Sequence, residues 1–185
     1  MKKRMDEGEQ KRIFDEWLSK HKGLFFKVVR AYAFDAHDRD DLFQEISIQV
    51  WNSIPSFRSE SGATTWIYRV ALYAAIAWTR REKKHHDGKQ PLTEAEFTLT
   101  ETAKFKDSRL DGLYEQITQL NEIDRSLTLL LLEGFSYQEM STILGISESN
   151  VGVKINRIKK RLTQKSQETV NHGVRRDEKN LGFTK

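Results

Sequence analysis

Apolar residues recur at helical spacing in two stretches of the chain, and a polar stretch separates them. Residues 10–84 hold all four tryptophans and predict one small helical domain. Residues 85–110 are polar and lack a sustained period, so we interpret them as a linker. Residues 111–165 are periodic again, and residues 166–185 form a polar tail that we expect to be frayed. The pattern predicts an all-α protein of two small helical domains joined by a polar linker.

The best-defined pattern is YQEMSTILGISESNVGVKINRIKKRL, residues 137–162. Ser136 and Glu139 are spaced as a capping box at the start of a helix. Gly145 is placed to end that helix in a left-handed conformation. Ser147 then caps a second helix, which is more basic than the first. Two helices joined by a short glycine-containing turn predict a helix-turn-helix in the C-terminal domain.

The second helix has two different faces. An apolar stripe should pack on the preceding helix, and it consists of Val151, Ile155, Ile158 and Leu162. The opposite face is polar and basic and carries Ser149, Asn150, Val153, Asn156, Arg157 and Lys160. Residues at the start of such a helix can contact base edges in the major groove of DNA.

The side chains on this helix suit DNA. Arg157 can bind guanine through two hydrogen bonds, and Asn150 or Asn156 can bind adenine in the same way, each worth roughly 1–3 kcal/mol of discrimination. Positive side chains that can bind phosphates are Lys154, Lys159, Lys160 and Arg161. The alternative is an antiparallel helix pair with a solvated basic face.

A second candidate surface lies in FRSESGATTWIYRVALYAAIAWTRREKK, residues 57–84. A polar loop leads into a helix near Thr64. At about 100° per residue, one face of this helix combines aromatic rings with arginines: Trp66, Arg69, Tyr73 and Arg80. Such a surface suits unstacked bases, because stacking on an aromatic ring is worth about 1–3 kcal/mol per base. The alternative is that these aromatic rings only cover a small core.

An acidic helix precedes this surface, in DRDDLFQEISIQVW at residues 38–51. Asp41, Gln44 and Glu45 share one face of it, and Leu42 belongs to its apolar side. These acids begin a helix, where the helix dipole favours negative charge, so we do not expect a metal site with His37. An acidic face on a basic protein favours a basic protein partner.

Composition narrows the class of protein only a little. The net charge of +4 and the pI of about 9.2 are compatible with nucleic acid but common among other proteins. The chain has no cysteine, which excludes disulfides and thiolate metal sites, and we expect a cytoplasmic protein. Its longest apolar run, near residues 127–132, is too short to insert into a membrane.

Taken in order, these motifs resemble a bacterial sigma factor of the extracytoplasmic-function (ECF) group, in the sigma-70 family. The DRDDLFQE segment resembles the part of such factors that binds core RNA polymerase. The segment at residues 57–84 resembles the promoter-melting part, including its TW-YR-A spacing. The segment at residues 120–162 resembles the C-terminal helix-turn-helix. The resemblance covers the chain from about residue 14 to residue 162.

The resemblance implies a role for each segment. Residues 10–84 would bind core polymerase, recognise the −10 element and melt it, and residues 111–165 would recognise the −35 element. The residues that would bind the clamp helices of the β′ subunit are Asp41, Leu42, Gln44 and Glu45. The residues that would contact the melted −10 element are Phe57, Arg58, Ser61, Thr64, Trp66, Arg69 and Tyr73. The residues that would contact the −35 element are Ser149, Asn150, Val153, Lys154, Asn156, Arg157 and Lys160.

The resemblance also implies partners. Core RNA polymerase would contact the protein through its β′ clamp helices and its β flap, promoter DNA would be bound, and an anti-sigma factor would hold the protein inactive. Such proteins need no cofactor and no metal and catalyse nothing themselves.

Two positions depart from the family pattern. Tyr73 stands where the family often has asparagine, and a phenol cannot reproduce the paired hydrogen bonds of an amide. Gly152 stands where arginine or lysine is common, which removes a DNA contact and costs roughly 1 kcal/mol of helix propensity relative to alanine.

Two other functions are alternatives to a sigma factor. A stand-alone helix-turn-helix regulator would need a dimerisation face, which the first domain does not offer, and would leave DRDDLFQE unexplained. A metal-dependent phosphohydrolase would use the acids between His37 and Glu45, but the sequence has no glycine-rich phosphate loop and no nucleophile–base pairing.

Overall fold

The computed structural model describes residues 5–86 and 108–180, and the side chains of residues 5–82 and 110–164. Every regular element in these residues is a helix, as the sequence predicts. The elements are α1 (Glu7–Tyr32), α2 (Ala36–Ser53), the short 3₁₀ helix η1 (Ile54–Ser56), α3 (Ala63–His86), α4 (Ser108–Thr118), α5 (Glu122–Leu132), α6 (Tyr137–Leu144) and α7 (Glu148–Asn180).

Local signals explain where α2 begins and where it ends. α1 is kinked at His21, whose backbone is not helical. The Asp35 side chain accepts a hydrogen bond from the Asp38 backbone N–H at 2.7 Å and so caps α2. Pro55 lies in the first turn of η1 and cannot donate the backbone hydrogen bond that would continue α2.

Helices α1, α2 and α3 pack on one another in the N-terminal domain. Their shared core contains Leu42, Ile46 and Val50 from α2, all fully buried, together with Phe25 and Ile67 from the two neighbouring helices. The burial of these apolar side chains is the main stabilising contribution to this domain.

Helices α4 to α7 form the C-terminal domain, in which α5 packs on α6 and on α7. Asn121 caps α5 by accepting a hydrogen bond from the Asp124 backbone N–H at 2.9 Å. Arg125 is buried and donates to the carbonyl oxygens of Thr118 and Leu120, which holds the end of α4 against α5.

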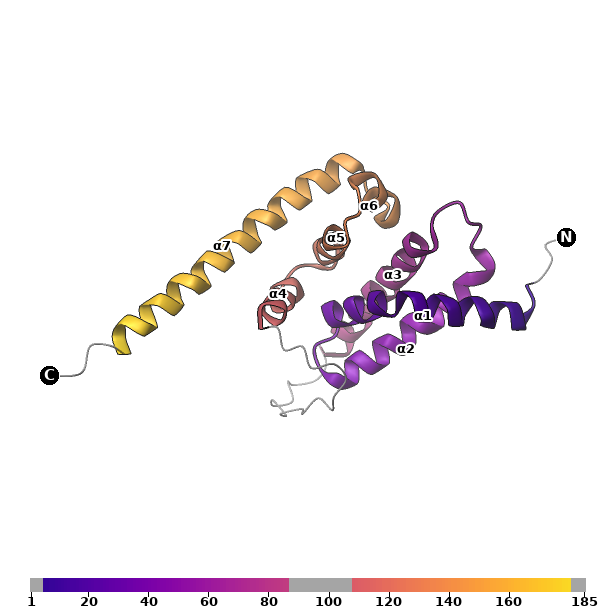
Figure 1. Ribbon diagram of the computed structural model, residues 1–185, viewed down its shortest axis with the longest axis horizontal. Coiled ribbons are helices and arrows are strands. Elements are labelled where there is room, and N and C mark those ends of the chain that lie inside the picture. Colours follow the sequence, from indigo (N-terminus) through magenta and orange to yellow (C-terminus); the bar gives the residue numbers. More distant parts are fainter. Residues whose placement is uncertain (1–4, 87–107, 181–185) are drawn as a thin grey trace.

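The two domains are in contact. α4 and α5 pack on α1, and α6 packs on α3. In Figure 1, α4, α5 and α6 lie between α7 and the α1–α3 bundle. Side chains of both domains belong to one continuous hydrophobic core, so the protein has no polar gap between its halves at this contact.

The C-terminal tail is helical for most of its length. The tail from residue 166 was expected to be frayed, but the backbone of α7 continues as helix to Asn180. This stretch contains no proline and many helix-forming residues, which explains the continuation. Most of the predicted linker, residues 87–107, lies outside the described residues. None of the helices in the described part is both long and apolar enough to cross a bilayer.

Candidate nucleic-acid interface

The helix-turn-helix has the local structure that the sequence predicts. Ser136 accepts from the Glu139 backbone N–H at 3.3 Å, and the Glu139 carboxylate accepts from the Ser136 backbone N–H at 2.8 Å, which completes the capping box. The hydrogen bonds that the Ser136 backbone N–H and the Ser136 hydroxyl donate to the carboxylate lower the pKa of Glu139 below its ordinary value. Gly145 follows α6 with φ of 68°, a left-handed conformation that favours glycine.

Helix α7 is oriented by its apolar stripe. Val151, Ile155 and Ile158 are buried, and Leu162 is half-buried at the end of the stripe. Because this stripe faces α5 and α6, the opposite side of α7 is left to the solvent. We call that side the reading face; it consists of Ser149, Asn150, Val153, Asn156, Arg157 and Lys160, all exposed.

Lys154 differs from the other predicted contacts on this helix. Its ammonium group lies 3.0 Å from a carboxylate oxygen of Asp124 in α5, and its side chain is only 29% exposed. The charge of Lys154 is therefore matched within the protein, and the side chain links α7 to α5 instead of pointing outward with the reading face.

Gly152 lies beside α6. A Cβ atom at this position would be 3.6 Å from the Tyr137 ring, an ordinary van der Waals distance. Packing therefore does not require a glycine here. Because glycine has no side chain, the surface of α7 next to the reading face offers no side-chain contact at this position.

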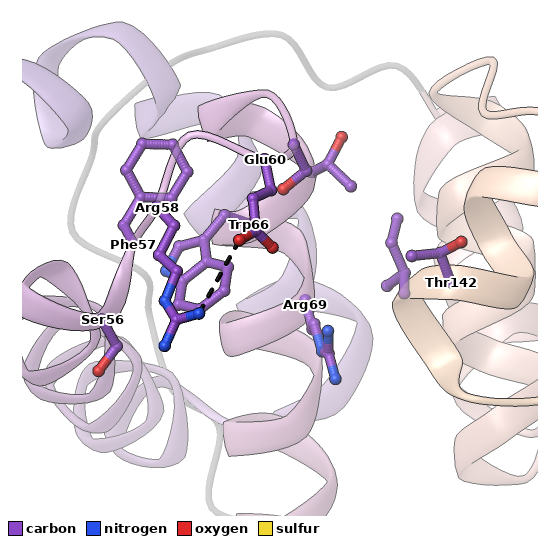
Figure 2. A pocket seen from close by; sticks show the side chains of 10 residues that line it. Ser56, Phe57, Arg58, Glu60, Trp66, Arg69 and Thr142 are labelled. Atoms are coloured by element: carbon purple, nitrogen blue, oxygen red, sulfur yellow. Dashed lines mark ion pairs between the residues drawn. The ribbon is translucent and has the colours of Figure 1, made fainter.

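The predicted melting residues gather around one hollow of about 500 Å³, shown in Figure 2. We call it the melting hollow. Its lining includes five of the seven predicted residues: Phe57, Arg58, Ser61, Trp66 and Arg69. The lining also includes residues that the sequence did not single out, namely Ser56, Glu60, Thr65, Thr142 and Ile143.

The loop that forms one wall of the melting hollow turns sharply. Ser59 has φ of 58°, which non-glycine residues adopt rarely and which is found preferentially at functional sites. The Arg58 guanidinium lies 3.9 Å from the Glu60 carboxylate on the exposed side of the loop. Nothing in the sequence signals the conformation of Ser59, because no glycine or asparagine stands there.

The aromatic rings of the melting hollow are held by a cluster beneath it. The Trp66 indole N–H donates to the Ser53 hydroxyl at 3.0 Å. The Phe57 ring packs against Trp66 at 5.7 Å and against buried Trp17 at 5.1 Å, measured between ring centres. Trp17 was not predicted to support this site, because it is 40 positions from Phe57 and its helix gives no local signal of that contact.

The other two predicted melting residues lie elsewhere. Thr64 is exposed in the first turn of α3 but is not part of the lining, where its neighbour Thr65 lies. The Tyr73 side chain is 47% exposed, and its hydroxyl donates to the Leu144 carbonyl oxygen of α6 at 3.3 Å. Tyr73 therefore faces the C-terminal domain in this structure.

The acidic face of α2 forms a separate shallow hollow. Asp41, Gln44 and Glu45 line it together with Ile48, which is 54% exposed, and Arg81 of α3. The Glu45 carboxylate lies 3.4 Å from the Arg81 guanidinium. The predicted acidic residues thus lie on one surface, together with an exposed isoleucine that was not predicted to belong to it.

Leu42 requires a correction. It was predicted to contact core polymerase, but it has no exposed surface and belongs to the core of the N-terminal domain. A fully buried side chain cannot touch a partner, so Leu42 supports the acidic face from below. Within the described side chains, no three histidine, aspartate or glutamate residues are placed to hold a metal ion.

Family models match both halves of the chain. The model for sigma-70 region 2 matches residues 17–85, and the model for sigma-70 region 4 matches residues 110–162. The first match contains the acidic face and nearly all of the melting hollow, and the second contains the helix-turn-helix.

Proteins similar in sequence to this chain are also sigma factors. The RNA polymerase sigma factor YlaC of Bacillus subtilis is 28% identical over 137 residues, which cover 69% of this chain and 79% of YlaC. The ECF RNA polymerase sigma-E factor of Haemophilus influenzae is 26% identical over 176 residues, which cover 89% of this chain and 92% of that protein.

Solved structures share the fold. The sigma factor RpoE, solved in complex with the anti-sigma factor NepR from Bartonella quintana, matches with a TM-score of 0.63 and 19% identity, covering 83% of this chain and 96% of RpoE. CnrH, solved with the cytosolic domain of CnrY, matches with a TM-score of 0.61 and 18% identity, covering 85% and 90%. With both regions matched in order and with ECF factors among its relatives, this chain belongs to the sigma-70 family of RNA polymerase sigma factors, in the ECF group.

Proposed function

We propose that this sigma factor directs core RNA polymerase to promoters through three separate surfaces. The reading face binds the duplex −35 element, the melting hollow holds an unstacked base of the −10 element, and the acidic face binds core polymerase. The observation that carries this proposal is the melting hollow, because residues predicted from a linear motif converge there on one cavity.

The side chains of the melting hollow suit a single-stranded base. Trp66 and Phe57 offer ring surface that is already oriented by Ser53 and Trp17. Stacking on such a ring is worth about 1–3 kcal/mol per base, which is comparable to the few kcal/mol needed to extrude a base from the duplex. Arg58 and Arg69 supply positive charge for the phosphates on either side.

The acidic face suits a basic protein surface. Its exposed Ile48 gives an apolar centre, and Asp41 and Glu45 give negative charge beside it. Changing both Asp41→Arg and Glu45→Arg should abolish association with core polymerase. Retained co-purification of that double variant would remove the acidic face from the docking surface.

The proposed role includes no chemistry by the chain itself. The three surfaces bind and position, and the phosphodiester chemistry belongs to the polymerase. Because RpoE and CnrH were solved with protein partners that include an anti-sigma factor, we extend the proposal to an anti-sigma factor that holds this chain inactive.

The decisive experiment uses the full chain and sigma-free core RNA polymerase from its own source. The mixture is run on gel filtration, and transcription is assayed from a library of genomic fragments. Co-elution with discrete new transcripts is the expected result and would reveal the promoters. Specific duplex binding without co-elution would instead identify a stand-alone regulator.

A further inference from the structure

The first part of α1 packs beside the melting hollow, although none of the described residues that line the hollow belongs to it. α1 is kinked at His21, where φ of −115° and ψ of 17° leave the helical region. We call residues 7–20, which precede the kink, the brace. Figure 1 shows this part of α1 beside the end of α2 and the loop that leads to α3, and α1 contacts η1 there. The sigma-70 region 2 model begins to match only at residue 17, so most of the brace precedes the matched region.

The brace supplies a hydrogen bond at the end of α2. In a continuing α-helix the Trp51 carbonyl oxygen would accept from the backbone N–H four residues on, but that residue is Pro55, which has none. The Trp51 carbonyl accepts from the Ile54 backbone N–H instead, and the Gln10 side-chain amide donates to it at 2.8 Å. A carbonyl oxygen has two lone pairs, so it can accept both hydrogen bonds. Gln10 therefore attaches the brace to the carbonyl that Pro55 cannot serve.

Aromatic contacts continue from this hydrogen bond to the melting hollow. The Phe14 ring meets the Trp51 ring edge-on at 5.5 Å between centres. Further along the brace, the buried Trp17 ring meets the Phe57 ring edge-on at 5.1 Å, with 85° between the ring planes. Phe57 packs in turn on Trp66, which lines the hollow with it. Edge-on ring pairs have a preferred geometry, so these contacts transmit the position of the brace to Phe57.

The position of the Phe57 ring depends on contacts from outside its own loop. Phe57 directly follows η1, and its backbone N–H donates to the Ile54 carbonyl oxygen at 3.0 Å. Its φ of −69° and ψ of 120° are extended, and residues 58–60 after it are exposed. Its ring is held between two rings from other elements, those of Trp17 and Trp66. A binding site needs side chains whose rotamers are fixed by such packing.

We propose that the brace is a positioning segment for promoter melting: Gln10 fixes it to the end of α2, and Trp17 then holds the Phe57 ring in place for the unstacked base. The inference rests on the proposed function of the melting hollow. Gln10 and Trp17 do not touch DNA, and both act through Phe57. The rings of the hollow are then already oriented when the base arrives, which strengthens its binding.

The test replaces the Gln10 donor. Gln10→Ala removes it without changing the net charge, and Gln10→Lys replaces the amide by an ammonium group that can donate to the same carbonyl oxygen. Ser19→Ala, at an exposed position of the brace, is the matched control. A fluorinated phenylalanine placed only at position 57 gives one ¹⁹F NMR signal that reports the environment of the Phe57 ring in the full chain.

The Phe57 signal should shift or broaden in Gln10→Ala, whereas Gln10→Lys and Ser19→Ala should keep the parent signal. Strand opening is measured on the holoenzyme, as permanganate reactivity of the −10 element of a promoter found in the transcription assay. It should fall about 2- to 10-fold in Gln10→Ala, the size expected for one hydrogen bond, and recover in Gln10→Lys. Association with core polymerase and the footprint on the −35 duplex should stay at parent values in all three variants.

Three results would overturn the proposal. In the first, Gln10→Ala changes neither the Phe57 signal nor strand opening. In the second, the signal changes but opening stays normal, which means that the ring needs no positioning. In the third, opening falls together with core association or with the −35 footprint, which marks a general loss of structure.

The brace and the proposed function can fail separately. If the parent holoenzyme opens no promoter, the proposed role of the melting hollow is wrong. The ¹⁹F signal of the free chain needs neither polymerase nor DNA, so it still decides whether Gln10 orients the Phe57 ring.

Discussion

The reading face and the melting hollow are built in opposite ways. The reading face comes from one helix, within twelve consecutive positions of α7 (residues 149–160), and all six of its side chains are exposed. The melting hollow combines the end of η1, a loop, α3 and, in this structure, α6 of the other domain. A surface on one helix needs only the burial of the opposite stripe, whereas a hollow needs several elements to be placed correctly at once.

The largest effect is expected where the reading face depends on its own core. Ile155→Ala should lower the free energy of unfolding by about 2–5 kcal/mol, because the fully buried side chain leaves a cavity between α7 and its neighbours. Urea denaturation followed by circular dichroism measures this. Val153→Ala, at a position 47% exposed, is the matched control and should change stability by less than about 0.5 kcal/mol.

The next largest effect is expected in the melting hollow, from the loss of one aromatic ring. Trp66→Ala should leave core binding intact and weaken strand opening by about 1–3 kcal/mol, the value of stacking one base. Permanganate reactivity of the opened promoter measures it. Ser53→Ala removes only the hydrogen bond that orients the indole and should give a smaller defect. Normal opening in Trp66→Ala would remove this residue from the melting surface.

Two basic residues of α7 sharpen the definition of the reading face. Arg157 is exposed, so Arg157→Ala should weaken binding to the preferred upstream duplex by about 1–3 kcal/mol. Lys154 is paired with Asp124, so Lys154→Ala should weaken that binding less. Footprint titration on the same promoter compares them. Equal losses would show that the Asp124 pair breaks on DNA and frees Lys154.

A gain is expected at Gly152. Gly152→Ala should raise the free energy of unfolding by about 1 kcal/mol, because alanine favours the helix and the new methyl group has room beside Tyr137. Thermal unfolding of the full chain measures the gain. A loss of stability would mean that α6 and α7 are closer at this point than an ordinary contact allows.

The smallest effect concerns the capping box that precedes the reading helix. The pKa of Glu139 is lowered in the folded state by hydrogen bonds from Ser136. Its contribution is therefore present above its unfolded pKa, near 4.5, and is lost as the pH falls through the lower folded value. Glu139→Gln keeps the hydrogen-bonding pattern and should show less loss of stability over this acidic range in denaturation curves. An identical pH dependence would contradict the assignment.

The sequence predicts well those parts of the molecule whose conformation is determined by residues close to them along the chain. The residue types of the helix-turn-helix themselves indicate its local structure: Ser136 and Glu139 form the capping box, and Gly145 adopts the left-handed conformation of the turn. The exposed reading face follows from the spacing of the buried stripe. The resemblance to sigma factors adds the order of the segments, and the family matches confirm it.

The parts that the sequence does not predict depend on distant residues. Trp17 supports Phe57 from another helix, Thr142 and Ile143 reach the melting hollow from another domain, and Ser59 adopts a left-handed conformation without a residue type that signals it. Leu42 was assigned a partner from the resemblance alone, although the helical period had already placed it on the apolar side of its helix, and its side chain is buried in the core. Linear motifs therefore locate such a site but do not say which of its residues touch the ligand.

The Lys154–Asp124 pair has a consequence for the entropy of DNA binding. Asp124 is itself held by the Asn121 side chain, which donates to its second carboxylate oxygen at 2.8 Å. A long lysine side chain that is ordered when it becomes buried gives up about 1.5–2 kcal/mol of rotamer freedom. Here much of that freedom is given up when the protein folds, not when it meets DNA. Helix α7 therefore approaches the major groove already fixed in place against α5 and α6.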